Sequence, residues 1–214
     1  MKHKIEKNTV QETLILPLYS RKLCTELYPN LYQDETAVRL IDEIDYDFSE
    51  AEKNSRSLMQ RFGALEVAMR QNDLAWEVRD YLKTHPGAAV FFASGVFYYF
   101  LTQQVKALVR GMADAFPGGV LVFDAANRTA VKMIAKTWLK SAKIKDVGAY
   151  FAVSDAPKEI GEWDNRLQVT SRGYMLGYTD LKDPSVNGFF RFLARVGDGM
   201  MKMQIVKIGF GGKL

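Results

Sequence analysis

The sequence is short of the residues that the commonest metal and catalytic centres need. It has one cysteine, Cys24, and two histidines, His3 and His85, among 214 residues. A single cysteine excludes an intramolecular disulfide and a cysteine-cluster metal site. Two histidines supply little for a histidine metal centre or a Ser-His-Asp triad. We therefore expect no metal site, and we interpret Cys24 as a free thiol in a reducing cytoplasm.

Long apolar runs and concentrated charge are also lacking. No stretch reaches the roughly 18 apolar residues of a membrane-spanning helix, so we expect no membrane association. The formal net charge is +4, and the basic residues are scattered apart from a modest lysine cluster. Lys132, Lys136 and Lys140 fall on one helical face, which is typical of a solvated surface. Without interleaved aromatic residues or a recognisable module, we expect no nucleic-acid partner.

Hydrophobic spacing predicts helices over the first part of the chain. Asp34 can cap a helix, and residues 51–83 lack proline and repeat apolar residues every three or four positions. That pattern predicts two amphipathic helices with a break at Gly63. Pro86 and the glycine after it end the helical region. Residues 1–86 are therefore predicted to form an N-terminal helical arm and cap.

The hydrophobic period then changes to alternating strands and helices. The apolar run 88–93 is typical of a strand buried on both faces, and 120–123 predicts a second such strand. Residues 102–116 predict a helix capped by Thr102, and another helix is expected over 127–141. This order predicts a parallel, layered α/β sheet with right-handed crossovers.

The last third of the chain has a different pattern. Residues 167–176 and 203–210 alternate like strands, with a helix expected near 186–195 and a short one at 157–163. A hairpin-like pair of strands added to the parallel sheet is the arrangement that this favours. Residues 87–214 would then form a sheet domain in one compact unit with the helical arm.

Several segments together resemble the leucine carboxyl methyltransferase family, and in particular its bacterial O-methyltransferases similar to the tetracenomycin polyketide enzyme. The resemblance covers nearly the whole chain, in the family's order. It is carried by LYSRKLCTELYPNLYQDETAVRLI at 18–41, DYDF at 45–48, AMRQNDLAWEVRDYLKTHP at 68–86 and SGVFYYFLTQQVKALVRGMADAFPGGVLVFDA at 94–125.

The resemblance implies a fold, a cofactor and a set of site residues. The fold would be α/β, a shortened class I methyltransferase-like (Rossmann-like) layered sheet with an N-terminal helical extension. The activity would be S-adenosylmethionine-dependent O-methylation of a hydroxyl or carboxyl group on a small-molecule acceptor. Positions that match cofactor-binding residues of the family are Arg21, Lys22, Arg70, Ser94, Gly95 and Tyr98. The basic residues would meet the methionine carboxylate, although they are equally typical of surface charges, and Tyr98 is also typical of a core aromatic. No catalytic residue is indicated, because methyl transfer mainly requires alignment of donor and acceptor.

Two features depart from the family. Ser94 stands where the family usually has glutamate. The family's glycine-rich turn, which follows the first strand and allows close backbone approach to the cofactor, is missing. Instead, residues 85–90 run directly into 91–95, as if the first strand were fused onto the fourth.

Three interpretations are open. The chain is an enzyme with a modified or shared cofactor pocket; or it is an internally deleted, non-catalytic scaffold that acts as a binding or dimerisation module; or its 214 residues omit a segment of a longer, ordinary methyltransferase. Within these 214 residues the strand at 88–93 would lack its usual neighbours. We expect its exposed edge either to pair with a second copy, as a homodimer, or to be covered by the N-terminal helices.

Overall fold

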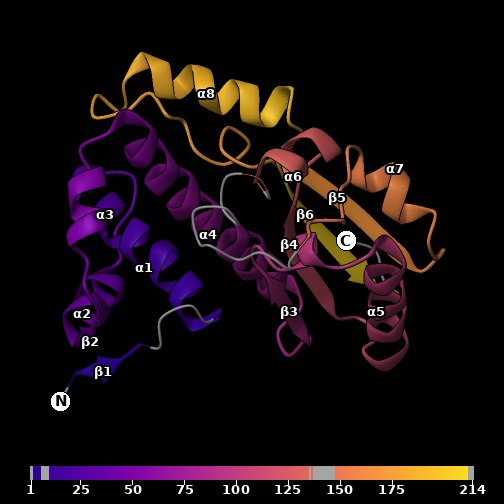
Figure 1. Ribbon diagram of the computed structural model, residues 1–214. Coiled ribbons are helices and arrows are strands. Elements are labelled where there is room, and N and C mark those ends of the chain that lie inside the picture. Colours follow the sequence, from indigo (N-terminus) through magenta and orange to yellow (C-terminus); the bar gives the residue numbers. More distant parts are fainter. Residues whose placement is uncertain (1, 6–9, 135, 137–147, 212–214) are drawn as a thin grey trace.

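The computed structural model describes residues 2–5, 10–134, 136 and 148–211. Helices from the N-terminal part lie together on one side, and a twisted sheet with its own helices lies on the other (Figure 1). The N-terminal elements are β1 (His3–Lys4), α1 (Val10–Leu27), α2 (Glu35–Glu43), β2 (Ile44–Asp45), α3 (Ser49–Asn54) and α4 (Leu58–Thr84). The strands β1 and β2 form a short parallel pair.

Helix boundaries in this part follow the capping residues. Asp34 caps α2 as predicted, because its side chain accepts a hydrogen bond from the Ala37 backbone N–H at 2.9 Å. The predicted break at Gly63 is wrong, since α4 passes through it without interruption. The helical region is instead interrupted between α3 and α4, where the Ser57 side chain caps α4 by accepting a hydrogen bond from the Gln60 N–H. One glycine inside a helix costs only about 1 kcal/mol, which burial of the rest of a long helix offsets.

The sheet contains β3 (Val90–Ala93), β4 (Val120–Ala125), β5 (Leu167–Gly173) and β6 (Gln204–Phe210) in the order β3-β4-β6-β5. Strands β3 and β4 are parallel, whereas β6 is antiparallel to both β4 and β5. The expected parallel pair with a hairpin-like pair added to it is therefore confirmed. The chain has an α/β fold built on a small mixed sheet.

Helices follow the strands in the expected order. They are the 3₁₀ helix η1 (Phe97–Tyr99), α5 (Thr102–Ala115), α6 (Arg128–Ile134), α7 (Ala156–Gly161) and α8 (Gly188–Gly199). The cap of α5 is Leu101 rather than Thr102, and the Leu101 N–H donates to Gln104 Oε1 at 2.8 Å. The expected helix at 127–141 is described as far as Ile134. Most of its remainder, with Lys140, lies outside the described residues.

Both faces of β4 are covered, which makes the structure layered. Leu121 and Phe123 pack in one cluster with α5 and α7, while Val120 and Val122 pack in another with α4. All six residues of β4 are buried. The helical arm and the sheet thus share a core through α4.

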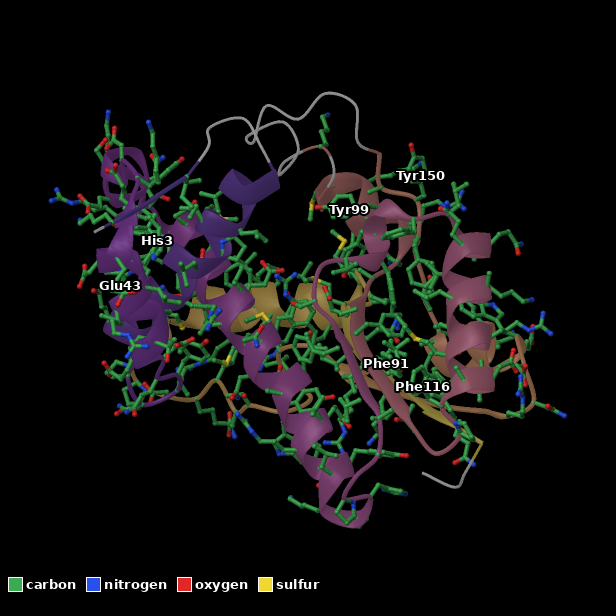
Figure 2. The ribbon with its side chains drawn as sticks, turned by 90° about the horizontal axis from the view of Figure 1, so that it is seen from below. His3, Glu43, Phe91, Tyr99, Phe116 and Tyr150 are labelled. Carbon is green, nitrogen blue, oxygen red and sulfur yellow. The ribbon has the colours of Figure 1, made fainter. Side chains whose placement is uncertain are left out.

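Strand β3 differs from its prediction. It was expected to be buried on both faces, yet Phe92 is 43% exposed, and the other residues of the strand are only partly buried. The reason is its place at the edge of the sheet, with β4 as its one neighbour among the described strands. Phe91 is the better packed aromatic of the strand, and its ring meets that of Phe116 edge-on at 4.9 Å (Figure 2).

None of the helices in the described ranges combines the length and the apolar character that crossing a membrane requires.

Candidate functional site

A buried carboxylate lies near the carboxyl end of β4 and gathers three partners. Asp124 is 2% exposed. Its Oδ1 accepts a hydrogen bond from the Gly95 backbone N–H at 2.6 Å, and its Oδ2 accepts one from the Tyr98 hydroxyl at 2.9 Å. Arg70 Nη1 approaches the same Oδ2 at 3.3 Å. We call these four residues the Asp124 cluster.

The local backbone explains why these groups meet. Strands β3 and β4 are parallel, so their carboxyl ends lie at the same edge of the sheet, where ligands of α/β proteins usually bind. Gly95 comes just after β3 with a φ of +67°, a left-handed conformation that favours glycine. A Cβ there would lie 3.5 Å from Arg70 Nη1, so space is adequate and the conformation is what selects glycine. The chain then enters η1, which carries Tyr98.

Arg70 holds its positive charge in an enclosed environment. Burial alone would lower its pKa, but Tyr174, Asp124 and the other nearby acidic groups raise the pKa above its ordinary value. Its Nε is buried and has no hydrogen-bond partner among the described residues. Burial raises the pKa of Tyr98 well above its usual range, with a further contribution from Asp124, so its hydroxyl stays protonated and donates.

Arg70 belongs to a polar stripe along α4. Glu66, Arg70, Asp73 and Glu77 are spaced by four, three and four residues, which places them on one helical face. Glu77 has two partners, because it accepts a hydrogen bond from the Tyr178 hydroxyl at 2.7 Å and pairs with Lys207 Nζ at 2.7 Å. Ionisable residues in such a row usually face solvent. Here Arg70 and Glu77 of the row face the sheet, where they pair with Asp124 of β4 and Lys207 of β6.

The other two acids of the stripe have raised pKa values. Asp73 is fully buried, and neither carboxyl oxygen has a hydrogen-bond partner among the described residues. Burial raises its pKa to about 8, with smaller contributions from Asp198 and Glu77. Burial also raises the pKa of Glu66 to about 7, even though the nearby Arg70 lowers it. Raised carboxyl pKa values of this kind are frequent at functional sites.

The structure brings together part of the residue set implied by the family resemblance. Arg70, Gly95 and Tyr98 meet at Asp124, and Ser94 is next to Gly95 in the bend that follows β3. The two basic residues of α1 have other partners. Arg21 Nε donates to Asp34 Oδ2 at 2.8 Å, and Lys22 Nζ donates to Glu26 Oε1 at 2.7 Å.

Sequence reasoning missed the centre of this arrangement. Asp124 lies within the segment 94–125 that carries the family resemblance, but neither it nor the acids of the α4 stripe were predicted as site residues. The signal for the stripe is present in the sequence, since four ionisable residues recur at helical spacing within an otherwise apolar pattern. In the described ranges, no group of three or more histidine, cysteine, aspartate or glutamate side chains is arranged to hold a metal ion.

Comparison with known proteins identifies no relative: the chain matches no protein-family model, no curated protein and no solved structure.

Proposed function

We propose that the chain is an S-adenosylmethionine-dependent O-methyltransferase acting on a hydroxyl or carboxyl group of a small molecule. The observation that supports this is the Asp124 cluster. Three positions that the family resemblance implies for the cofactor, contributed by α4, the turn after β3 and η1, meet at the carboxyl edge of two parallel strands. A cytoplasmic location fits the buried free thiol of Cys24.

The Asp124 cluster fits the amino-acid end of this cofactor. Arg70 has a buried Nε–H without a partner among the described residues, and a guanidinium is suited to binding a carboxylate through two parallel hydrogen bonds. Asp124 orients the guanidinium, and the Tyr98 hydroxyl together with the Gly95 N–H holds Asp124 in place. When bound, the cofactor supplies an electrophilic methyl group on its sulfonium. Arg70 would bind the carboxylate, and no proton transfer is assigned to any residue of the cluster.

The adenosyl end lacks a comparable fit, and this favours a second function. The strand β3 follows α4 directly, and after β3 the chain continues through Ser94 and Gly95 into η1, without a glycine-rich turn to approach an adenosine. Asp124 already provides Arg70 with a negative partner. Both observations favour a non-catalytic scaffold that keeps the fold and acts as a binding or dimerisation module.

Calorimetric titration with S-adenosylmethionine and with S-adenosylhomocysteine separates the two functions. A methyltransferase is expected to bind both compounds saturably, with one ligand per chain. A folded chain that gives no heat of binding with either compound would rule out the methyltransferase proposal and leave the scaffold.

A conservative variant tests the role of Arg70 itself. Arg70→Lys keeps the positive charge opposite Asp124, so the fold should persist, but it removes the planar fork that binds a carboxylate. We expect cofactor affinity to fall by about tenfold, the loss of one good charge-assisted hydrogen bond. Arg195→Lys, at an exposed position on α8, is the matched control and should bind as the wild type does. Equal affinity for the two variants would refute the assignment.

A further inference from the structure

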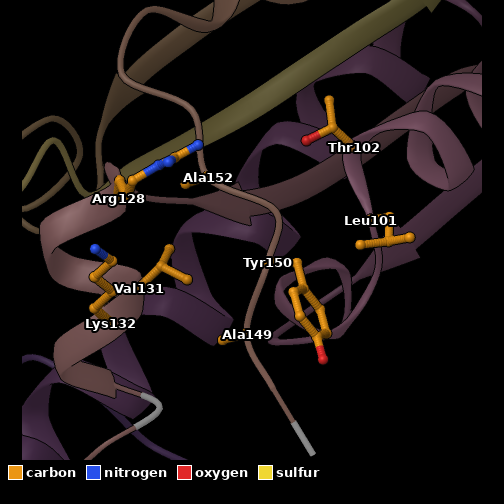
Figure 3. Close-up of a pocket in the computed structure, with 8 residues that line it drawn as sticks. All are labelled: Leu101, Thr102, Arg128, Val131, Lys132, Ala149, Tyr150 and Ala152. Atoms are coloured by element: carbon orange, nitrogen blue, oxygen red, sulfur yellow. The ribbon is translucent and has the colours of Figure 1, made fainter.

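A cavity of about 320 Å³ is lined by none of the four residues of the Asp124 cluster. Its walls include Leu101 and Thr102 at the start of α5, and Arg128, Val131 and Lys132 on α6. The segment that carries Tyr150 passes between these two walls (Figure 3). Its volume falls within the range of about 300–1,000 Å³ that small-molecule sites occupy.

The charge of the cavity has one sign. Arg128 and Lys132 are exposed and lie four residues apart, so they share a face of α6. Neither forms an ion pair with any residue that the structure describes, and none of the described residues that line the cavity is acidic. The start of the fourteen-residue helix α5 is at the opposite wall, where the helix dipole adds a partial positive charge. These features together favour an anion.

The cavity also exposes apolar surface. Two large side chains of the lining are largely exposed: Leu101 is 53% exposed and Tyr150 is 55% exposed. Val131 adds a buried aliphatic wall between the two cations. An aromatic or aliphatic body could contact these side chains while its charged group reaches Arg128 and Lys132, whereas inorganic phosphate would leave the apolar side chains exposed.

We infer that this cavity is a binding site for a small organic anion with an apolar body. The site does not rest on the proposed methyltransferase function, because none of the residues assigned to the cofactor lines it. It is nevertheless tied to the Asp124 cluster through the backbone, since the Tyr150 N–H donates to the Tyr98 carbonyl oxygen at 2.7 Å.

The test is a titration of the ¹⁵N-labelled protein, followed by NMR, with 1-naphthoate and with its neutral analogue 1-naphthamide. We expect 1-naphthoate to shift the backbone amide signals of Leu101, Thr102, Arg128 and Tyr150 saturably. We expect 1-naphthamide to bind at least tenfold more weakly, because it lacks the charge. Equal binding of the two compounds, or shifts confined to other parts of the chain, would overturn the inference.

Charge-removing variants test the two cations directly. The double variant Arg128→Gln with Lys132→Gln should bind 1-naphthoate about tenfold more weakly while keeping its affinity for 1-naphthamide. Lys158→Gln, which removes a charge from an exposed position on α7, should leave both affinities unchanged. Unchanged 1-naphthoate binding by the double variant would contradict the inference. All of these measurements omit S-adenosylmethionine, so their outcome is independent of the methyltransferase test.

Discussion

Arg70 of α4 and Asp124 of β4, 54 residues apart in the sequence, form an ion pair inside the protein with Nη1 and Oδ2 at 3.3 Å. The side chain of Asp124 is 1% exposed and that of Arg70 is 19% exposed, so solvent screens the pair little. The pair connects the helical arm to the carboxyl edge of the sheet. It is also the point from which the turn after β3 and the helix η1 are positioned.

Asp124→Asn should destabilise the protein. The amide keeps the shape of the side chain but removes the charge opposite Arg70, which leaves a poorly solvated cation. We expect a loss of about 2–4 kcal/mol in the free energy of unfolding, measured by urea denaturation. Asp180→Asn, at an exposed loop position, should change that free energy by less than about 0.5 kcal/mol. Similar midpoints for the two variants would show that the pair is not important for stability.

Tyr98→Phe should have a smaller effect. It removes the hydroxyl that donates to Asp124 while leaving the buried ring in place. The expected loss is about 1–2 kcal/mol, the usual effect of deleting one hydrogen bond to a charged group. Tyr99→Phe is the control, because Tyr99 is next to Tyr98 in the sequence but is 44% exposed. The account would be wrong about Tyr98 if both variants unfolded at the same urea concentration.

Asp73 should make stability depend on pH. Burial raises its pKa from an ordinary value of 3.8 to about 8. The folded protein therefore holds this proton where the unfolded chain releases it, and stability falls as pH rises from about 4 to about 8. Asp73→Asn removes this titration. The variant should match the wild type near pH 4 and exceed it near pH 8 by up to about 5 kcal/mol, because each pKa unit corresponds to about 1.4 kcal/mol.

Thermal or urea unfolding at several pH values checks this prediction, with Asp180→Asn as the control. A stability difference between Asp73→Asn and the wild type that stays constant from pH 4 to pH 8 would mean that Asp73 does not titrate in this range.

The exposed edge of β3 should promote self-association, as expected from its apolar sequence. Phe92 is 43% exposed on this strand, and no charged residue interrupts the strand. We expect a dimer in light scattering after size exclusion, and Phe92→Lys should convert it to a monomer. Phe189→Lys, which introduces the same charge at an exposed phenylalanine of α8, should leave the dimer intact. A wild-type chain that remains a monomer at all accessible concentrations would exclude pairing through this edge.

Cys24 should be unreactive in the folded protein. Its side chain is fully buried, and burial raises the pKa of the thiol to about 12. Thiol reagents act on the thiolate, so labelling at pH 8 should proceed at the rate of unfolding. Labelling that is complete within seconds under native conditions would contradict the buried position.

The order of helices and strands could be predicted from the sequence, because the period of its apolar residues changes at Pro86 and again in the last third. The burial of an element could not be predicted where it depends on neighbours that are distant in the sequence. The run 88–93 has the composition of a central strand, but its exposure depends on which strands flank it, and β3 has one neighbour among those described. The break expected at Gly63 failed because packing of the neighbouring residues of α4 against α1 and α2 outweighs the weak local preference of one glycine.

The same limit applies to the candidate site. Arg70, Gly95 and Tyr98 were identified through the family resemblance, and their convergence on Asp124 follows from parallel strands whose carboxyl ends share an edge. The burial of Asp73 could not be read from its residue type, because an aspartate on a helix is normally solvated. Arg21 and Lys22 matched the same resemblance, yet Arg21 pairs with Asp34 at the start of α2, and Lys22 pairs with Glu26 one turn further along α1.

A crystal structure of the chain grown with S-adenosylhomocysteine tests the role of the Asp124 cluster most directly. The account predicts that the amino-acid carboxylate of the ligand lies within hydrogen-bonding distance of the Arg70 guanidinium, beside Gly95. Well-ordered ligand bound elsewhere, with the Arg70–Asp124 pair unaltered and no ligand contact to either residue, would contradict it.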